Sequence, residues 1–426
     1  FGAELPLRAV FEAPTLAALA RRIDSAHLHS ALQAPAVRPV PRTGALPLSF
    51  AQQRLWLIDQ LQPGSPAYNI PTALRVAGAL DVTALESSLR ALIERHESLR
   101  TTFAVQDGEP VQVIHPAADF SLPVVDLSAL PTDEREARAR LLVTEDALRP
   151  FDLATGPLVR ASLLRLEPTS HVLLVTMHHI VSDAWSSGVL VRELAAFYAA
   201  RTTGTQPHLP PLAVQYADYA AWQRSWLQGD VLQAQLGYWR QQLSGAPALL
   251  ELPTHTPRPA VQSHRGASVP VSFSRAVSDE LLAFCQRQGT TPFMTLLAGF
   301  QLLLSRYSGQ DDVVVGAPIA GRNRAETEGL IGFFVNTLAL RSRIDSRASF
   351  AELLAQVKQT TLGAYEHQDV PFEKLVEELR PERSLSYSPL FQVMLAVQNT
   401  PTSALQLPGL SLRGIEGGSR VAKFDL

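Results

Sequence analysis

The sequence lacks several features that would indicate a particular class of protein. It has one cysteine, Cys285, so neither a disulfide framework nor a cysteine metal cluster can form within the chain. Its 37 basic residues are scattered among 40 acidic ones, and a net charge of −3 excludes the basic surface of a nucleic-acid-binding protein. The longest apolar stretch, residues 293–304, is too short to span a bilayer. We therefore expect no metal, no nucleic acid, no membrane, and a cytoplasmic protein.

The composition is that of a globular enzyme. Hydrophobic residues make up 46% of the 426 residues and charged residues 18%. One hydrophobic core rarely serves a chain of this length, so we predict two lobes. Alternating strand and helix patterns predict a mixed α/β (α+β) fold. Helices are expected near residues 80–96, 133–148, 279–288 and 293–307, and strands near residues 110–115, 170–178, 267–273 and 312–318.

The most informative stretch is residues 171–184, where an apolar strand ends in His178 and His179 and a helix begins shortly afterwards. Side chains alternate across a strand, so the two histidines point to opposite faces and do not readily chelate one metal ion. One of them can then face a cleft and accept a proton from a nucleophile. The residues alone leave another interpretation open, in which Asp183 is a helix N-cap and both histidines belong to the core.

Seven short motifs occur in order along the chain. They are SFAQQRLW (49–56), RHESLRTTF (95–103), HHIVSDA (178–184), YADYAAW (216–222), IGFFVNT (331–337), HQDVPFE (367–373) and SPLFQVM (388–394). Together they resemble the motifs of the condensation domains of non-ribosomal peptide synthetases, whose central signature reads HHxxxDG. The third motif departs from that signature at Ala184, where the family has glycine.

The resemblance implies two chloramphenicol-acetyltransferase-like lobes that form a V-shaped pseudo-dimer, with the reaction centre between them. His179 is expected to line that centre as a base or as a positioning group, with His178 beside it. Asp183 is expected to hold the loop through a salt bridge with an arginine. Arg100 and Arg265 are the candidate partners, although spacing alone selects neither.

The resemblance also implies which residues lie beside the substrates. We expect Ser182, Ala184 and Trp185 there, together with Asn336. Asparagine is unusual in a central strand, and a buried amide needs hydrogen-bond partners. From the residues alone, Asn336 either lines a site or is satisfied within the core.

The predicted organisation has four parts. Residues 1–25 resemble the end of a peptidyl carrier domain, residues 26–45 form a proline-rich linker, residues 46–225 form the first lobe, and residues 226–426 form the second, cut short at its C-terminus. The tail lacks the serine that bears phosphopantetheine, so the resemblance implies no cofactor attached to this chain. The phosphopantetheine arms of upstream and downstream carrier domains would enter a tunnel between the lobes, and a neighbouring adenylation domain is the other expected partner.

The reaction implied by the resemblance is amide-bond formation. The α-amine of an acceptor aminoacyl thioester attacks the carbonyl of a donor thioester, and a reference amine pKa of ~7.7–8.0 means that a modest base suffices. Residues 49–71 and 331–341 resemble domains that take an L-configured donor, and His178 argues against heterocyclisation. Two alternatives are a silent module that recruits partner domains, supported by Ala184, and a free-standing coenzyme A-dependent acyltransferase, which does not explain the tail and linker.

Overall fold

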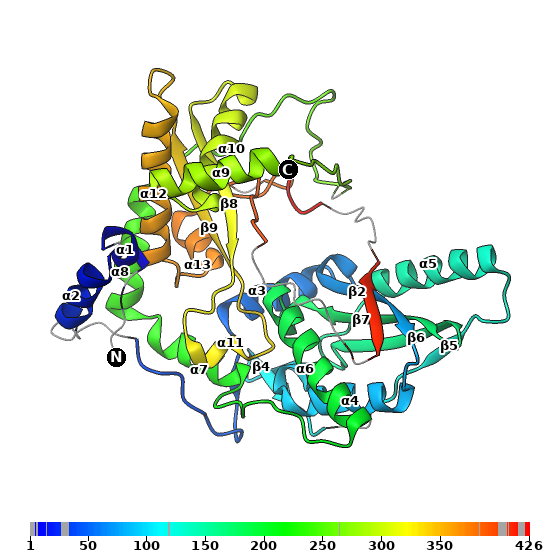
Figure 1. Ribbon diagram of the computed structural model, residues 1–426. Helices are drawn as coiled ribbons and strands as arrows, with labels where there is room; N and C mark the ends of the chain where they lie inside the picture. Colours follow the sequence, from blue (N-terminus) through cyan, green and yellow to red (C-terminus); the bar gives the residue numbers. More distant parts are fainter. Residues whose placement is uncertain are drawn as a thin grey trace.

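The computed structural model describes residues 5, 7–13, 15–26, 34–117, 120–263, 265–382, 384–398, 407, 409–415 and 422–426. Its helices are α1 (Leu7–Glu12), α2 (Leu16–Ala26), α3 (Phe50–Leu61), α4 (Val82–Arg95), α5 (Thr132–Leu148), α6 (Ala184–Thr203), α7 (Tyr216–Trp226), α8 (Gly229–Leu243), α9 (Arg275–Gln288), α10 (Pro292–Ser308), α11 (Ala325–Glu328), α12 (Phe350–Glu366) and α13 (Phe372–Leu379). Its strands are β1 (Leu46–Pro47), β2 (Asn69–Gly78), β3 (Thr101–Gln106), β4 (Glu109–Ile114), β5 (Val124–Asp126), β6 (Val159–Glu167), β7 (Ser170–His178), β8 (Asp312–Ile319), β9 (Asn336–Arg343) and β10 (Leu410–Gly414). The helices and strands form two lobes. In Figure 1, the lobe that contains β2, β5, β6 and β7 lies below, and the lobe that contains β8 and β9 lies above.

The first lobe is built on a sheet of order β10-β2-β7-β6-β5, in which only β5 and β6 run parallel. Strand β7 is central and buried along almost its whole length because helices cover both faces of the sheet. Leu173, Val175 and Met177 pack with residues of α4 and α6, whereas Val172 and Leu174 pack with residues of α5. The period-two alternation of a strand thus delivers His178, its last residue, to the end of the lobe where the site lies.

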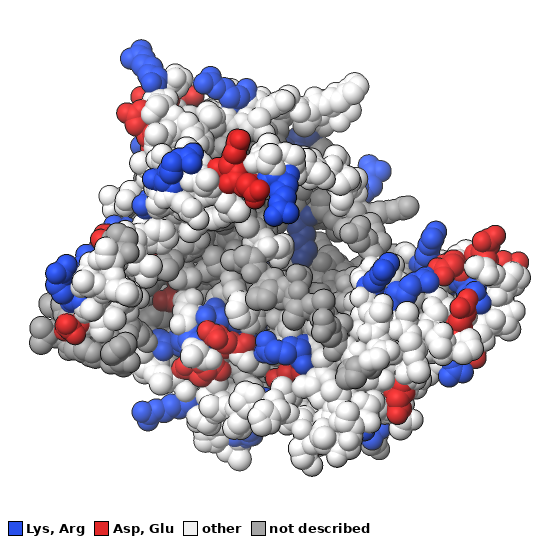
Figure 2. Space-filling model, viewed as in Figure 1, with Lys and Arg blue, Asp and Glu red and all other residues white. Residues whose placement is uncertain are grey.

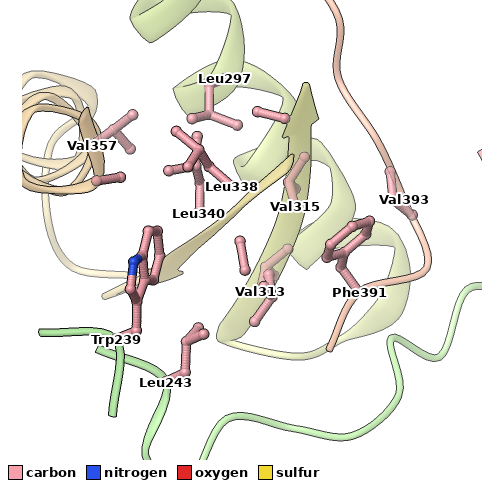
Figure 3. Packing of buried hydrophobic residues seen from close by; sticks show 14 of the residues in the cluster. Trp239, Leu243, Leu297, Val313, Val315, Leu338, Leu340, Val357, Phe391 and Val393 are labelled. Carbon is pink, nitrogen blue, oxygen red and sulfur yellow. The ribbon is translucent and has the colours of Figure 1, made fainter. Parts of the chain in front are cut away.

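The second lobe packs helices α8, α10 and α12 around the antiparallel pair β8–β9. Figure 3 shows this core, in which Trp239, Leu297 and Val357 surround side chains of the two strands. Residues 391–395 run along the other edge of β8, where Gly316 N donates to Val393 O (2.9 Å) and Leu395 N donates to Gly316 O (2.9 Å). The ring of Phe391 then lies over Gly316, which has no side chain to displace it.

Most of the predicted elements are confirmed, and the mixed α/β two-lobed architecture is confirmed with them. The predicted strand at residues 267–273 is wrong, because the segment is extended but unpaired among the described residues. Its alternating side chains Val269, Val271 and Phe273 are 84%, 75% and 71% exposed. An alternating apolar pattern predicts a strand only where a neighbouring strand supplies hydrogen bonds.

The division into lobes differs from the predicted boundary at residue 226. Strand β10, which follows all the second-lobe elements in sequence, pairs with β2 and forms an edge of the first-lobe sheet (red in Figure 1). The 320–335 segment between β8 and β9 also reaches the first lobe, where Ile331 joins its core. The second lobe is therefore not one contiguous stretch, since pairing partners far apart in sequence leave no local signal.

The predicted linker is a packed strap over residues 34–45, while residues 27–33 lie outside the described part of the chain. Val37 is buried, Trp222 Nε1 donates to Pro35 O (2.6 Å), and Arg42 pairs with Asp218 (2.6 Å). Helices α1 and α2 precede it, and Arg8 on α1 pairs with Glu366 on α12 (2.8 Å). No helix among the described residues is both long and apolar enough to cross a bilayer, and no three potential metal ligands there come together.

We predict that Gly316→Ala destabilises the second lobe, because a β-carbon at this position would lie 2.2 Å from Cε2 of Phe391. Overpacking of this kind costs about 1–3 kcal/mol. Gly299→Ala in α10 is the matched control, since its β-carbon meets no described atom within 4 Å and alanine favours helix by up to ~1 kcal/mol. Urea unfolding followed by tryptophan fluorescence measures both, and equal midpoints for the two variants would contradict this packing.

Candidate active site

His178 ends β7 inside the first lobe. Its ring is 4% exposed and lies 6.0 Å from the ring of Phe151 and 6.4 Å from that of Tyr68, centroid to centroid. Its Nδ1 accepts a hydrogen bond from Ile180 N (3.1 Å), so the neutral ring carries its proton on Nε2. Burial, reinforced by the positive charge that His179 and Lys423 can carry, lowers the pKa of His178 to about 3. The side chain is therefore a neutral part of the scaffold.

His179 is the first residue of the 3₁₀ turn η4 (His179–Val181) and is half-buried. Its Nδ1 lies 2.9 Å from Ser182 O, and because a carbonyl oxygen only accepts, Nδ1 carries the proton. The lone pair on Nε2 is then the acceptor. Burial, together with Lys423, lowers the pKa of His179 to about 4, while Asp183 acts in the opposite sense. At neutral pH the ring is uncharged, with an acceptor nitrogen fixed by the backbone of its own loop.

Asp183 caps α6 and also anchors the other lobe. Its Oδ1 accepts from Ser186 N (2.8 Å) and its Oδ2 from Phe334 N (2.9 Å), while Nη2 of Arg322 lies 3.2 Å from Oδ1. Both the N-cap and the salt bridge expected from the sequence are therefore present. Both members of the ion pair are buried.

The arginine is Arg322, so the prediction of Arg100 or Arg265 is wrong. Arg100, directly before β3, donates to the carbonyl of His115, and Arg265 lies exposed before α9. Arg322 sits in the loop after β8, a position that no motif marks. It was missed because its partner is 139 residues away in sequence.

Arg322 also organises its own loop. Its Nη1 donates to Thr327 O (2.6 Å) and Leu330 O (2.8 Å), and its guanidinium lies 4.0 Å from the centre of the Phe334 ring. Burial lowers the pKa of this guanidinium, and Asp183 opposes that effect. A charge held inside protein needs such compensation, and the loop provides it with carbonyl oxygens and an aromatic face.

Further contacts hold the 330–334 segment on the first lobe. Ser186 Oγ donates to Gly332 O (2.9 Å), and Ser98 Oγ donates to Ile331 O (2.7 Å). Ile331 N donates to Nδ1 of His96 (3.4 Å), whose Nε2 contacts Glu193 Oε2 at 2.7 Å. Figure 1 shows this loop descending from β8 to α6 and α7. It brings the ring of Phe333 against that of His179, at 4.8 Å and nearly edge-on.

The four residues expected beside the substrates have different positions. Ser182 is fully buried and its hydroxyl has no partner among the described residues, so it contributes through its carbonyl. Ala184 is exposed as the first residue of α6, and Trp185 donates from Nε1 to Glu328 O (2.9 Å). Asn336 donates to Gln368 O and Val370 O and accepts from Phe372 N and Thr337 N, so scaffold groups engage its whole amide. Of the four, Ala184 is exposed, Trp185 and Asn336 are half-buried, and Ser182 is buried.

A pocket opens between the lobes on the far side of Phe333. Its void, including the open mouth, is about 520 Å³. Aromatic rings, amides and carboxylates line it: Tyr219, Trp222, Trp226, Phe333, Asn323, Asn336, Gln368, Asp369 and Glu373 are among them. His179 does not line this pocket, but Phe333, whose ring packs against that of His179, does.

The histidine pair at the end of β7, the interlobe salt bridge and the pocket agree with the comparison with known proteins. Residues 42–426 match the family described as "Condensation domain". The chain belongs to the condensation-domain family. It is 55% identical over its whole length to one of the linear gramicidin synthase proteins of Brevibacillus parabrevis, of which it covers 6%. It is 47% identical to phosphinothricin tripeptide synthetase PhsB of Streptomyces viridochromogenes, covering 99% of the chain and 36% of that protein.

Solved structures agree with this assignment. The X-domain from teicoplanin biosynthesis superimposes with a TM-score of 0.82 at 33% identity, covering 92% of this chain and 86% of that one. The first condensation domain of the CDA synthetase gives a TM-score of 0.71 at 22% identity, with 88% of each chain covered, which shows the common fold. Condensation domains of peptide synthetases form amide bonds, so the chain is an enzyme domain of the acyltransferase class. It spans less than a tenth of the linear gramicidin synthase proteins that it matches.

We predict that Asp183→Asn lowers the free energy of unfolding by about 3–5 kcal/mol, because the amide leaves Arg322 as a buried charge without a counter-charge. The exposed pair of Lys374 and Glu377 (2.8 Å) offers a matched control, and Glu377→Gln should cost less than ~1 kcal/mol. Chemical denaturation measures both changes. A loss for Asp183→Asn as small as that of the control would show that the ion pair does not hold the lobes together.

Proposed function

We propose that this condensation domain joins a donor acyl thioester to the α-amine of an acceptor aminoacyl thioester, and that His179 receives the amine. The observation that supports the proposal is the tautomer of the His179 ring. Its Nδ1–H donates to Ser182 O, and its Nε2 is left as an unprotonated acceptor at the junction of the lobes. A neutral amine donating to Nε2 keeps its own lone pair free for the thioester carbonyl.

The lowered pKa of His179 supports the positioning role over the role of a base that deprotonates the ammonium. An imidazole whose pKa is lowered to about 4 is a weaker base than an amine of reference pKa ~8, so moving a proton from the ammonium to His179 is uphill. We infer that His179 first positions the amine as a hydrogen-bond acceptor. It takes the proton only once the new C–N bond has made the nitrogen cationic. The C–S bond then breaks, and the proton passes to the departing thiolate, so the products are an amide and a thiol.

The phosphopantetheine arms of partner carrier domains are the proposed means of delivery. A phosphopantetheine arm contains amide groups and methyl groups. The interlobe pocket has polar side chains that can hydrogen-bond to the amides and aromatic rings that can contact the methyl groups. Stacked Trp222 and Trp226 rings (5.2 Å) supply apolar surface, and Asn323 and Gln368 supply amides. Carrier domains and an adenylation domain of the same synthetase are the proposed partners, in the cytoplasm. The chain's own motifs favour an L-configured donor.

Residues 1–25 remain a proposed carrier-domain tail. The pairing of Arg8 with Glu366 would then hold the end of the upstream carrier domain against α12 of the second lobe. That arrangement supports delivery of the donor from a carrier domain tethered through the strap of residues 34–45.

The alternative function is recruitment of a partner enzyme by a catalytically silent domain. It is favoured by the similarity to the X-domain in its complex with OxyB from teicoplanin biosynthesis, with 34% identity and a TM-score of 0.81. The unprotonated Nε2 of His179 favours the catalytic function, because a module that only recruits needs no acceptor at the lobe junction.

We predict that His179→Ala abolishes amide formation, by at least ~10²-fold, and leaves the unfolding midpoint unchanged, because a half-buried ring is lost at the reaction centre and not from the core. His178→Ala should instead lower stability by ~2–4 kcal/mol, since it empties a buried aromatic site. His208→Ala, on an exposed loop, is the control. Product formation between loaded carrier domains measures activity. Normal turnover by His179→Ala would refute both of its proposed roles.

We predict that Ala184→Gly changes the rate by less than about tenfold, or 1.4 kcal/mol of barrier. Ala184 lies in the first turn of α6 at negative φ, a conformation that alanine adopts without strain, so glycine relieves nothing there. The same product assay, run on the alanine and glycine forms together, measures the ratio. Amide product from the glycine form alone would support the recruitment function instead.

A further inference from the structure

Two adjacent phenylalanines in the 320–335 loop have different surroundings. Phe334 is 3% exposed, and the centre of its ring lies 4.9 Å from that of Tyr216 and 4.7 Å from that of Tyr219. Phe333 is only half-buried, and its ring lies edge-on against the ring of His179, with the centroids 4.8 Å apart. It also lines the interlobe pocket. Phe334 is therefore held in an aromatic core, whereas Phe333 belongs to both the pocket and the surroundings of His179.

The backbone around Phe333 is fixed to helices α6 and α7. Tyr216 Oη, on α7, donates to Phe333 O (2.7 Å), and Phe334 N donates to Oδ2 of Asp183, the N-cap of α6 (2.9 Å). A β-carbon at Gly332 would lie 2.0 Å from Cδ2 of Tyr216, so the loop approaches α7 as closely as it does because residue 332 is glycine. The Cα of Phe333 thus has one defined place, and its ring projects from a rigid support.

The ring of Phe333 is also packed on two sides. It contacts the buried cluster that includes Ile180 and Val181, the two residues that follow His179 in turn η4. It contacts a second buried cluster as well, to which Tyr219 of α7 belongs. Because both clusters are closely packed, a substrate that meets this ring cannot easily displace it.

We propose that Phe333 is a specificity-determining residue of the condensation reaction, whose ring limits the size of the acceptor's side chain. The proposal rests on the proposed function, in which the acceptor amine donates a hydrogen bond to Nε2 of His179. Such a bond, about 2.6–3.2 Å long, leaves the α-carbon one covalent bond beyond the amine. The side chain on that carbon then lies among the groups that touch the imidazole, and the ring of Phe333 is one of them.

The interlobe pocket gives the direction of approach. Figure 2 shows the surface hollowed between the two lobes, and the pocket lies between the lobes as well. Phe333 lines the pocket and touches His179, so the aminoacyl end of an arm held in the pocket meets Phe333 before it reaches Nε2. Removing the ring would join the space beside His179 to the pocket. One methylene in an apolar site changes kcat/KM by roughly 10–200-fold, so losing a whole ring should change the size preference by at least tenfold.

The first test is the size preference for the acceptor. We compare kcat/KM for tryptophanyl and alanyl N-acetylcysteamine thioesters with one fixed donor, in the native domain and in Phe333→Ala, Phe333→Leu and Phe333→Tyr. The tryptophanyl-to-alanyl ratio should rise at least ~10-fold in Phe333→Ala and by less in Phe333→Leu. Phe333→Tyr keeps the ring and should keep the native ratio. Phe284→Ala is the matched control, since Phe284 is half-buried on α9, and it should not change the ratio.

The unfolding midpoint of each variant is measured alongside. If Phe333→Ala does not fold, Phe333→Leu keeps an apolar side chain between the two clusters and still removes the ring. A ratio that stays native in the folded Phe333 variants would overturn the proposal, even if all acceptors react more slowly, because a purely structural role slows them alike.

The second test does not depend on turnover. Isothermal titration measures the dissociation constants of the tryptophanyl and alanyl amides that correspond to the two thioesters but cannot transfer their acyl group. The tryptophanyl amide should gain affinity relative to the alanyl amide in Phe333→Ala, and an unchanged ratio of the two constants would overturn the proposal. Normal turnover by His179→Ala would instead refute the proposed function, while the binding ratio would still report whether Phe333 limits the side chain.

Discussion

The carboxylate of Asp183 and the guanidinium of Arg322 form a buried ion pair between the lobes, and the geometry of the site depends on this ion pair. A buried ion pair gains little net stability over a well-packed apolar pair, but losing either partner is costly. The arrangement of the lobes is therefore tied to one carboxylate that also caps α6. Arg322 orders the carbonyls of its own loop as well, so the same contact fixes the loop that carries Phe333 against His179.

Two adjacent histidines become chemically different because a strand ends between them. His178 keeps the strand direction, is enclosed by aromatic rings and uses Nδ1 to accept from Ile180 N. His179 begins a 3₁₀ turn, and its Nδ1–H donates to Ser182 O, which leaves Nε2 as the acceptor nitrogen. Tautomer and orientation are thus set by backbone groups within three residues, and no carboxylate in the described part of the chain hydrogen-bonds to His179.

The site is a composite of both lobes. The first lobe supplies the histidines and Asp183, and the second supplies Arg322 and Phe333. Strand β10, which follows β8 and β9 in sequence, lies in the first-lobe sheet, so the chain crosses between the lobes once more before its last residues. Separating the lobes would therefore change the charge and the packing around His179 together. Ala184 lies outside these contacts, at the start of α6.

The sequence by itself determined the elements whose signals are local. Period-two and helical patterns placed β7, β8 and α10, and the motifs assigned the family. The sequence predicted that His178 and His179 differ in orientation, although the difference arises because β7 ends at His178 and not from alternation within the strand. Only the tertiary structure decided that Arg322, and not Arg100 or Arg265, pairs with Asp183, that residues 267–273 are unpaired among the described residues, and that β10 joins the first lobe. These outcomes depend on contacts between residues separated by more than a hundred positions. Spacing along a chain carries no information about such contacts until packing has brought the segments together.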